Sequence, residues 1–151
     1  MSVLINESFA NETSKLWAKA GIRVVSCSNI SANAVVPLSP TSVNILTTPT
    51  FSSSIPGTFV LSSTFYYNTT NVPSSFIPVI ALNGTNVVSN IFMNTAPTTP
   101  GLGGNAGNMH NDYYFTNTLG TSYSLVFSIS QSSSSAVANA NVSYSLLFFP
   151  A

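Results

Sequence analysis

Charged side chains are almost missing from this 151-residue chain, which has three Lys and Arg residues and three Asp and Glu residues. They make up 4% of the sequence, whereas roughly 25% is usual for a soluble protein. The formal net charge is zero, so the chain lacks the clustered basic side chains that release counterions from a nucleic acid. We therefore expect no nucleic-acid partner.

Cysteine and histidine are also scarce, with one of each, Cys27 and His110. A single cysteine excludes an intramolecular disulfide and a cysteine metal cluster. We interpret Cys27, in RVVSCSN, as a small buried strand residue. One subunit has too few carboxylates, imidazoles and thiols for a metal site, although three copies of His110 on a trimer axis would suffice to hold an ion. We predict no metal and no cofactor.

Long apolar runs are absent as well. No window approaches the roughly 20 apolar residues of a membrane span. The first residues, MSVLINESFANETSKLWAKAG, have neither the basic start nor the apolar stretch of a signal peptide. The sequence therefore predicts no membrane span and no secretory leader.

The few charges are unevenly distributed along the chain. Between residues 24 and 151 the only ionised side chain is Asp112, and all the others lie in the first 23 residues. We predict a charged N-terminal extension or anchor over residues 1–23 and an uncharged domain over residues 24–151. Because solubility usually depends on net charge, a surface of hydroxyls and amides is typical of a protein built into an assembly.

The pattern within the uncharged part has the two-residue period of strands with one buried face. In the clearest example, residues 123–130, Tyr123, Leu125, Phe127 and Ile129 alternate with mostly hydroxyl residues. Longer segments of the same kind are 58–67, 76–82 and 142–149, and shorter ones are 22–28, 42–48, 86–93 and 112–118. Turn-rich pieces separate them, which predicts an all-β sandwich or barrel of about eight strands. Only residues 11–21 look helical, with Gly21 as the left-handed residue at the end.

Two local signals concern turns. Asn83-Gly84 is typical of a two-residue type I′ hairpin turn, which would pair residues 77–82 with 85–91. The segment GLGGNAGNMH, residues 101–110, has the glycine spacing of a dinucleotide-binding loop, but a proline-rich stretch precedes it and an aromatic strand follows it. We therefore predict a long loop that binds no cofactor. The predicted exposed binding residues of this loop are Gly101, Gly103, Asn105, Asn108 and His110.

Catalytic groups are sparse. His110 and Asp112 are the only general acid or base candidates after residue 23, and their spacing puts both on one side of a strand. An abundant serine would complete a triad, but serine is so common here that the match has little weight. We predict that both residues satisfy backbone groups at the start of a strand and that the protein is not an enzyme.

Adjacent aromatic residues on a strand point to opposite faces, so one of each pair must lie outside the core. On a weakly charged protein we expect such outward rings to contact a partner subunit, with sugar stacking as the alternative. The predicted assembly contacts are Phe9, Leu16, Trp17, Tyr66, Tyr114 and Phe149.

Four segments together, PGTFVLSSTFYYN, FIPVIALNGTNVV, GTSYSLVFSIS and VSYSLLFF, resemble the strands of the tumour-necrosis-factor and complement-head type of jelly roll. The matching positions are Gly57 and Phe59, Asn83 and Gly84, residues 120–127 and residues 145–149. The last strand lacks the usual internal glycine, and residues 121 and 122 are Thr and Ser where the family often has an acidic residue. The resemblance implies a single jelly-roll β-sandwich of antiparallel strands that forms a homotrimer, as in receptor ligands and in small proteins of virions and phage fibres.

These observations favour a non-enzymatic structural protein of a virion, as a minor capsid, spike or fibre-head component. Its partners would be further copies of itself and other capsid or shell proteins. One alternative is a carbohydrate-binding adhesin or lectin, extracellular or at a cell surface, with a host glycan as ligand. Another is a filament subunit whose N-terminal stretch is donated to the sheet of a neighbour.

Overall fold

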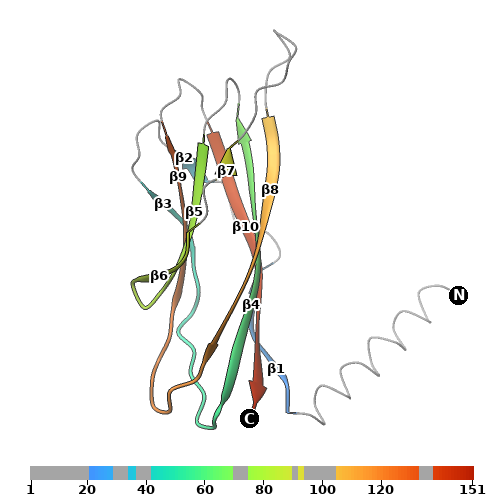
Figure 1. The fold of residues 1–151 in the computed structure, drawn as a ribbon, viewed down its shortest axis with the longest axis vertical. Helices are drawn as coiled ribbons and strands as arrows, with labels where there is room; N and C mark the ends of the chain where they lie inside the picture. The colour runs from blue at the N-terminus through green and yellow to red at the C-terminus, as the bar shows by residue number, and fades with distance from the viewer. Residues whose placement is uncertain are drawn as a thin grey trace, which may run out of the picture.

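The computed structural model describes residues 21–28, 34–36, 42–69, 75–89, 92–93, 105–132 and 138–151. Every regular element in these ranges is a strand (Figure 1). The strands are β1 (Arg23–Ser28), β2 (Ala34–Val36), β3 (Val43–Thr47), β4 (Gly57–Thr69), β5 (Ser75–Leu82), β6 (Thr85–Ser89), β7 (Phe92–Met93), β8 (Asn105–Thr116), β9 (Leu125–Ser132) and β10 (Ala138–Pro150).

Two antiparallel sheets face each other. The first sheet has the strand order β1-β10-β4-β8, with β2 also paired to β10, and the second has the order β3-β9-β5-β6, with β7 also paired to β5. The pairs are nested: β1 with β10, β3 with β9, β4 with β8 and β5 with β6. This nesting is a long antiparallel ribbon wrapped into a sandwich, which is a jelly roll. The predicted all-β jelly-roll sandwich is confirmed.

The core lies between the sheets and follows the two-residue period. Phe59, Leu61, Leu125, Phe127 and Phe148 are fully buried, and their neighbours in sequence lie on the outer sides of the sheets. The rings pack in edge-to-face, tilted or stacked arrangements, for example Phe51 edge-to-face on Phe59 with centroids 5.1 Å apart. The prediction that the alternating apolar residues of 123–130 form a buried face is therefore confirmed. Burial of these rings supplies the main driving force for folding.

The Asn83-Gly84 turn joins β5 to β6 as predicted. Asn83 and Gly84 have φ values of 48° and 83°, and Leu82 pairs directly with Thr85. Two consecutive positive φ values define the type I′ turn, whose twist matches that of the flanking strands. Of the stretch 86–93, expected as one strand, the residues up to Ser89 lie in β6 and Phe92–Met93 form β7, and residues 90 and 91 lie outside the described residues. Ser89 and Phe92–Met93 pair with β5 in the same antiparallel register.

The structure corrects the prediction for the glycine-rich segment. Strand β8 begins at Asn105, so Asn105, Asn108 and His110 lie in a strand and not in a loop. The reason is that β4 extends to Thr69, whose register partner is Asn105. Pairing with this long neighbour extends β8 back into a sequence that has no strand signal of its own. In the same way β10 begins at Ala138, within a stretch expected to be a turn.

The prediction that Cys27 is buried is also wrong, because this residue is exposed. It lies on β1 at the edge of the first sheet and pairs with Ser145. Residues 11–20 of the segment 11–21 predicted to be helical lie outside the described residues, as do the predicted sites Phe9, Leu16, Trp17, Gly101 and Gly103. Gly21 has the expected left-handed backbone, with a φ of 75°. The division at residue 23 stays a prediction, and β1 begins at that residue.

Candidate functional site

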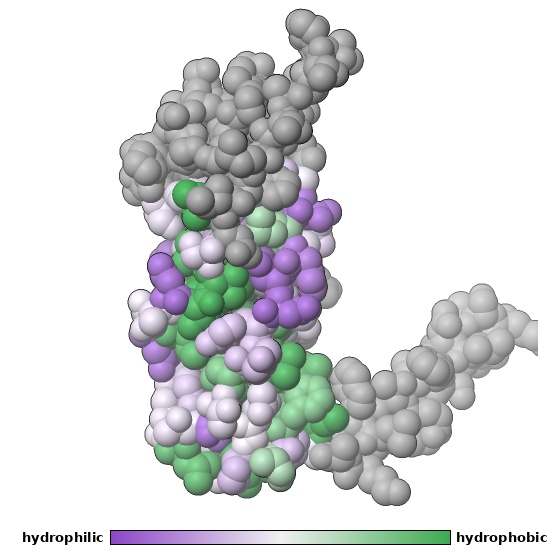
Figure 2. Space-filling model, in the orientation of Figure 1, coloured by the Kyte–Doolittle hydropathy of each residue, from purple (hydrophilic) through white to green (hydrophobic). Residues whose placement is uncertain are grey.

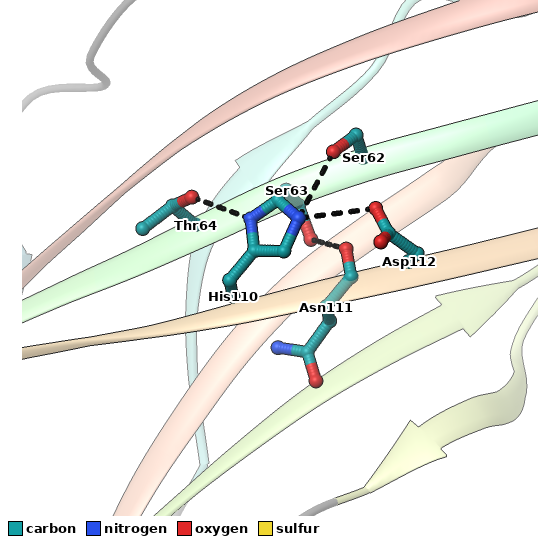
Figure 3. Close-up of polar contacts among 6 residues, drawn as sticks. All are labelled: Ser62, Ser63, Thr64, His110, Asn111 and Asp112. Carbon is teal, nitrogen blue, oxygen red and sulfur yellow. Dashed lines mark hydrogen bonds and ion pairs between the residues drawn. The ribbon is translucent and has the colours of Figure 1, made fainter.

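His110 is exposed and the next residue, Asn111, is buried, so the imidazole lies on the outer face of the first sheet, away from the core. Figure 3 shows its contacts with side chains of β4 and β8. Its Nδ1 atom lies 3.0 Å from Thr64 Oγ1, and its Nε2 atom lies 3.3 Å from Ser62 Oγ and 3.1 Å from Asp112 Oδ1. Because the Asp112 carboxylate only accepts, Nε2–H donates to it, and in the neutral ring Nδ1 accepts from the Thr64 hydroxyl. These side-chain contacts fix the orientation of the imidazole.

This arrangement corrects the expectation that His110 and Asp112 bond to backbone groups at the start of a strand. Both residues lie well inside β8, where the backbone is engaged in the ladder with β4. Their side chains instead contact each other and the hydroxyls of the neighbouring strand. The sequence does show alternating polar residues in both strands. It does not show the register of β4 with β8, which brings these polar side chains together.

The order hydroxyl, imidazole, carboxylate in Thr64, His110 and Asp112 resembles a nucleophile with its base and orienting acid. An activated nucleophile also needs exclusion of water and donors aimed at an oxyanion. Here 56% of the His110 side chain and 68% of the Asp112 side chain are exposed. The contacts therefore describe a hydrogen-bonded surface cluster and carry no argument for catalysis.

Beside the imidazole the outer face is hollowed, with a cavity volume of about 280 Å³. Its walls come from β1, β4, β8 and β10, and hydroxyl groups dominate the lining. The lining residues are Ser28, Ser62, Ser63, Thr64, His110, Ser143, Tyr144 and Ser145. We call this the hydroxyl hollow. Such a surface offers many hydrogen-bond donors and acceptors and little charge.

Next to the hydroxyl hollow, one apolar side chain from each of four strands forms a continuous line. Val24 pairs with Leu147, Leu147 with Val60, and Val60 with Tyr114. The two ends are open, with Tyr114 75% exposed and Val24 56% exposed. We call these four residues the outer apolar row. Figure 2 shows, in one view, that hydrophobic and hydrophilic residues are mixed over the described surface.

The predicted assembly contacts that the structure describes, Tyr66, Tyr114 and Phe149, all belong to the first sheet. Tyr66 and Phe149 are half-buried and Tyr114 is exposed. Their role in assembly stays a prediction. Val24, Val60 and Leu147 were missed, because single aliphatic residues in a strand give no sign of which neighbours will flank them across the sheet.

Neither a metal site nor a membrane-spanning helix is found in the part of the chain that the structure describes. Within those ranges no three His, Cys, Asp or Glu side chains form a group able to hold a metal ion. The same residues include no helix of the length and hydropathy needed to cross a bilayer.

No protein-family model matches the chain, and no curated protein matches it in sequence. Solved structures with a similar fold include infectious bursal disease virus, Gx strain, at 14% identity and a TM-score of 0.47, covering 84% of this chain and 31% of that one. Dimeric latent PorU from Porphyromonas gingivalis matches at 10% identity and a TM-score of 0.49, covering 85% and 12%. A mutant VP2 protein of infectious bursal disease virus in T=1 particles matches at 12% identity and 0.46, covering 85% and 35%.

The chain therefore spans about a third or less of the length of each of these proteins. At such low identity the likeness concerns the fold alone.

Proposed function

We propose that this chain is a non-enzymatic structural subunit of a virion, a minor capsid, spike or fibre-head component, that acts by assembling with itself as a homotrimer. The observation that carries the proposal is the outer apolar row, Val24, Leu147, Val60 and Tyr114, which crosses the whole first sheet. Exposed apolar side chains in a continuous patch are typical of a subunit contact.

The electrostatics of this face support the same function. Asp112 is the only acidic residue after residue 23, and apart from the His110 imidazole the outer face around it consists of hydroxyl, amide and apolar groups. Burying such a face against a second copy carries little penalty for removing charges from water. A weakly charged domain also gains solubility when its subunits cover each other.

The experiment is the solution mass of the full chain by light scattering, compared with the double variant Val60→Ser, Tyr114→Ser. We expect a mass of three chains of 15.9 kDa, or a multiple of three, and a shift to smaller species in the variant. Leu119→Ser is the matched control, because Leu119 is exposed to 56% but lies in a turn outside the row. A monomeric unmodified chain would contradict the proposal.

The virion setting is tested separately. Particles are purified from the source of the protein, and the chain is sought by peptide mass spectrometry after a high-salt wash. Retention at a constant ratio to the main shell protein supports a structural component. Its absence from washed particles contradicts that role while leaving the self-association result unaffected.

Carbohydrate binding is a second candidate function, favoured by the hydroxyl hollow with its carboxylate neighbour Asp112 and the exposed Tyr114 ring on the same face. Sugar hydroxyls pair with such donors and acceptors, and a ring face packs against a pyranose. A glycan array would then give binding that Asp112→Ala abolishes and Asn44→Ala, on the exposed surface of β3, preserves. A trimer that buries the first sheet cannot present the hollow, so the mass measurement also separates the two functions.

A further inference from the structure

Strand β8 forms one edge of the first sheet. It is 12 residues long and pairs with β4 along one side. Among the described residues no strand pairs with its other side. A long unpaired edge presents backbone N–H and C=O groups on which another strand can add. This edge therefore offers an interaction surface different from the outer apolar row.

The only carboxylate and the only imidazole after residue 23 both lie on this edge strand, at Asp112 and His110. They point to the same outer face, two residues apart, and bond to each other at 3.1 Å. More than half of each side chain is nevertheless exposed. Each therefore retains surface with which to contact a second polar group.

We propose that β8 pairs in antiparallel fashion with β8 of a second copy of this chain, around a two-fold axis at Asn111. The inference rests on the proposed self-association and adds a second, symmetric contact to it. A two-fold contact between trimers would join them into a larger assembly, because combining the two axes generates further copies.

The register follows from the pleat and from charge. Directly opposed residues of an antiparallel pair point to the same face, so a two-fold axis must pass through a residue position. An axis at residue 110 would place His110 opposite itself, and an axis at 112 would place Asp112 opposite itself. An axis at Asn111 places His110 opposite Asp112 of the partner subunit, twice by symmetry. In this register a ring N–H is able to donate to the carboxylate opposite it, whereas an axis at 112 places two carboxylates opposite each other, which destabilises a strand pair.

The same two residues bear on a competing outcome, which the test separates from pairing. Charged side chains on an edge strand often prevent edge-to-edge association. Under that reading the chain would not join through β8 at all, and no cross-link specific to one register would form.

The experiment is register-specific disulfide formation. It uses the full chain with Cys27→Ser, because the native Cys27 thiol is exposed. His110→Cys and Asp112→Cys are purified separately, mixed and oxidised. In the proposed register each new cysteine lies directly opposite the other in the partner, and the mixed dimer still keeps one His110 to Asp112 pair. We expect a disulfide-linked dimer in the mixture.

Each variant alone should cross-link at least tenfold less. Its two cysteines would then be diagonal neighbours about 7–8 Å apart, which is too far for a relaxed disulfide. A second matched mixture, Asn108→Cys with Tyr114→Cys, should also link, whereas Asn108→Cys with His110→Cys should not. All four substituted positions are exposed and the buried Asn111 is left unchanged, so circular dichroism should show native folding throughout.

Charge complementation provides an independent measurement. His110→Asp and Asp112→His should each lose the edge contact in sedimentation velocity, and their mixture should regain it, because acidic residues then face basic ones. Equal cross-linking in every combination, or none in the first mixture, overturns the proposal. Light scattering of the same samples distinguishes the failures: trimers without edge cross-links reject the edge contact alone, and monomers reject the proposed self-association as well.

Discussion

Gly107 lies directly opposite Tyr67 in the pairing of β8 with β4, and the tyrosine side chain occupies the space that a Cβ at residue 107 would need. A Cβ built there would be 2.1 Å from Tyr67 Oη and 2.4 Å from Cζ. The ring is held by stacking on Phe76, with centroids 4.6 Å apart. The glycine in GLGGNAGNMH closest to His110 thus serves packing within a strand and not a loop conformation.

Replacing Gly107 with alanine should therefore destabilise the fold by about 1–3 kcal/mol, the usual penalty for overpacking. The free energy of unfolding in urea measures this. In a Tyr67→Leu background the same substitution should be much less harmful, because the obstructing ring is gone, and a double-mutant cycle isolates the coupling. Equal effects in both backgrounds would contradict the packing explanation.

The same tyrosine should make stability sensitive to alkaline pH. Burial raises the pKa of the Tyr67 phenol above its ordinary value. The folded protein then holds this proton more tightly than the unfolded chain does, so the contribution is complete below about pH 10. It is lost as the pH rises from there through the folded-state pKa. Denaturation followed against pH should show a shallower alkaline decline in Tyr67→Phe than in the unmodified protein.

The turn between β5 and β6 should depend on backbone conformation alone. Gly84 has a φ of 83°, and no atom lies within 4 Å of a Cβ placed there. Gly84→Ala should reduce the unfolding free energy by roughly 1 kcal/mol, since an L residue is strained at positive φ. Thr85→Ala, at the next exposed position, serves as the control and should have a smaller effect in thermal denaturation.

The centre of the core should respond to loss of volume. Phe127 is fully buried and stacks on Tyr144 at 5.1 Å between centroids. We expect Phe127→Ala to destabilise the protein by about 3–5 kcal/mol, through lost transfer energy and the cavity left behind. Val126→Ala, on the opposite face of the same strand, is the matched control. Similar midpoints for both variants in a urea titration would mean that the core is not centred on this ring.

Much of this architecture follows from local pattern. Tyr123, Leu125, Phe127 and Ile129 are buried as their spacing predicts, because successive side chains of a strand point to opposite faces. Asn83 and Gly84 form their turn because few residues tolerate two positive φ values in succession. The scarcity of charge is the basis for predicting assembly and no nucleic-acid partner, and both stay predictions.

The tertiary structure alone decided which strands are neighbours and in what register. Thr64 is 46 residues from His110 in sequence, and only the pairing of β4 with β8 makes it a partner of the imidazole. The same pairing turned part of a glycine-rich segment into an edge strand, and it aligned Val60 with Tyr114. Periodicity fixes the face on which a side chain lies, but its cross-strand neighbours depend on how the whole ribbon wraps around its core, which no local segment encodes.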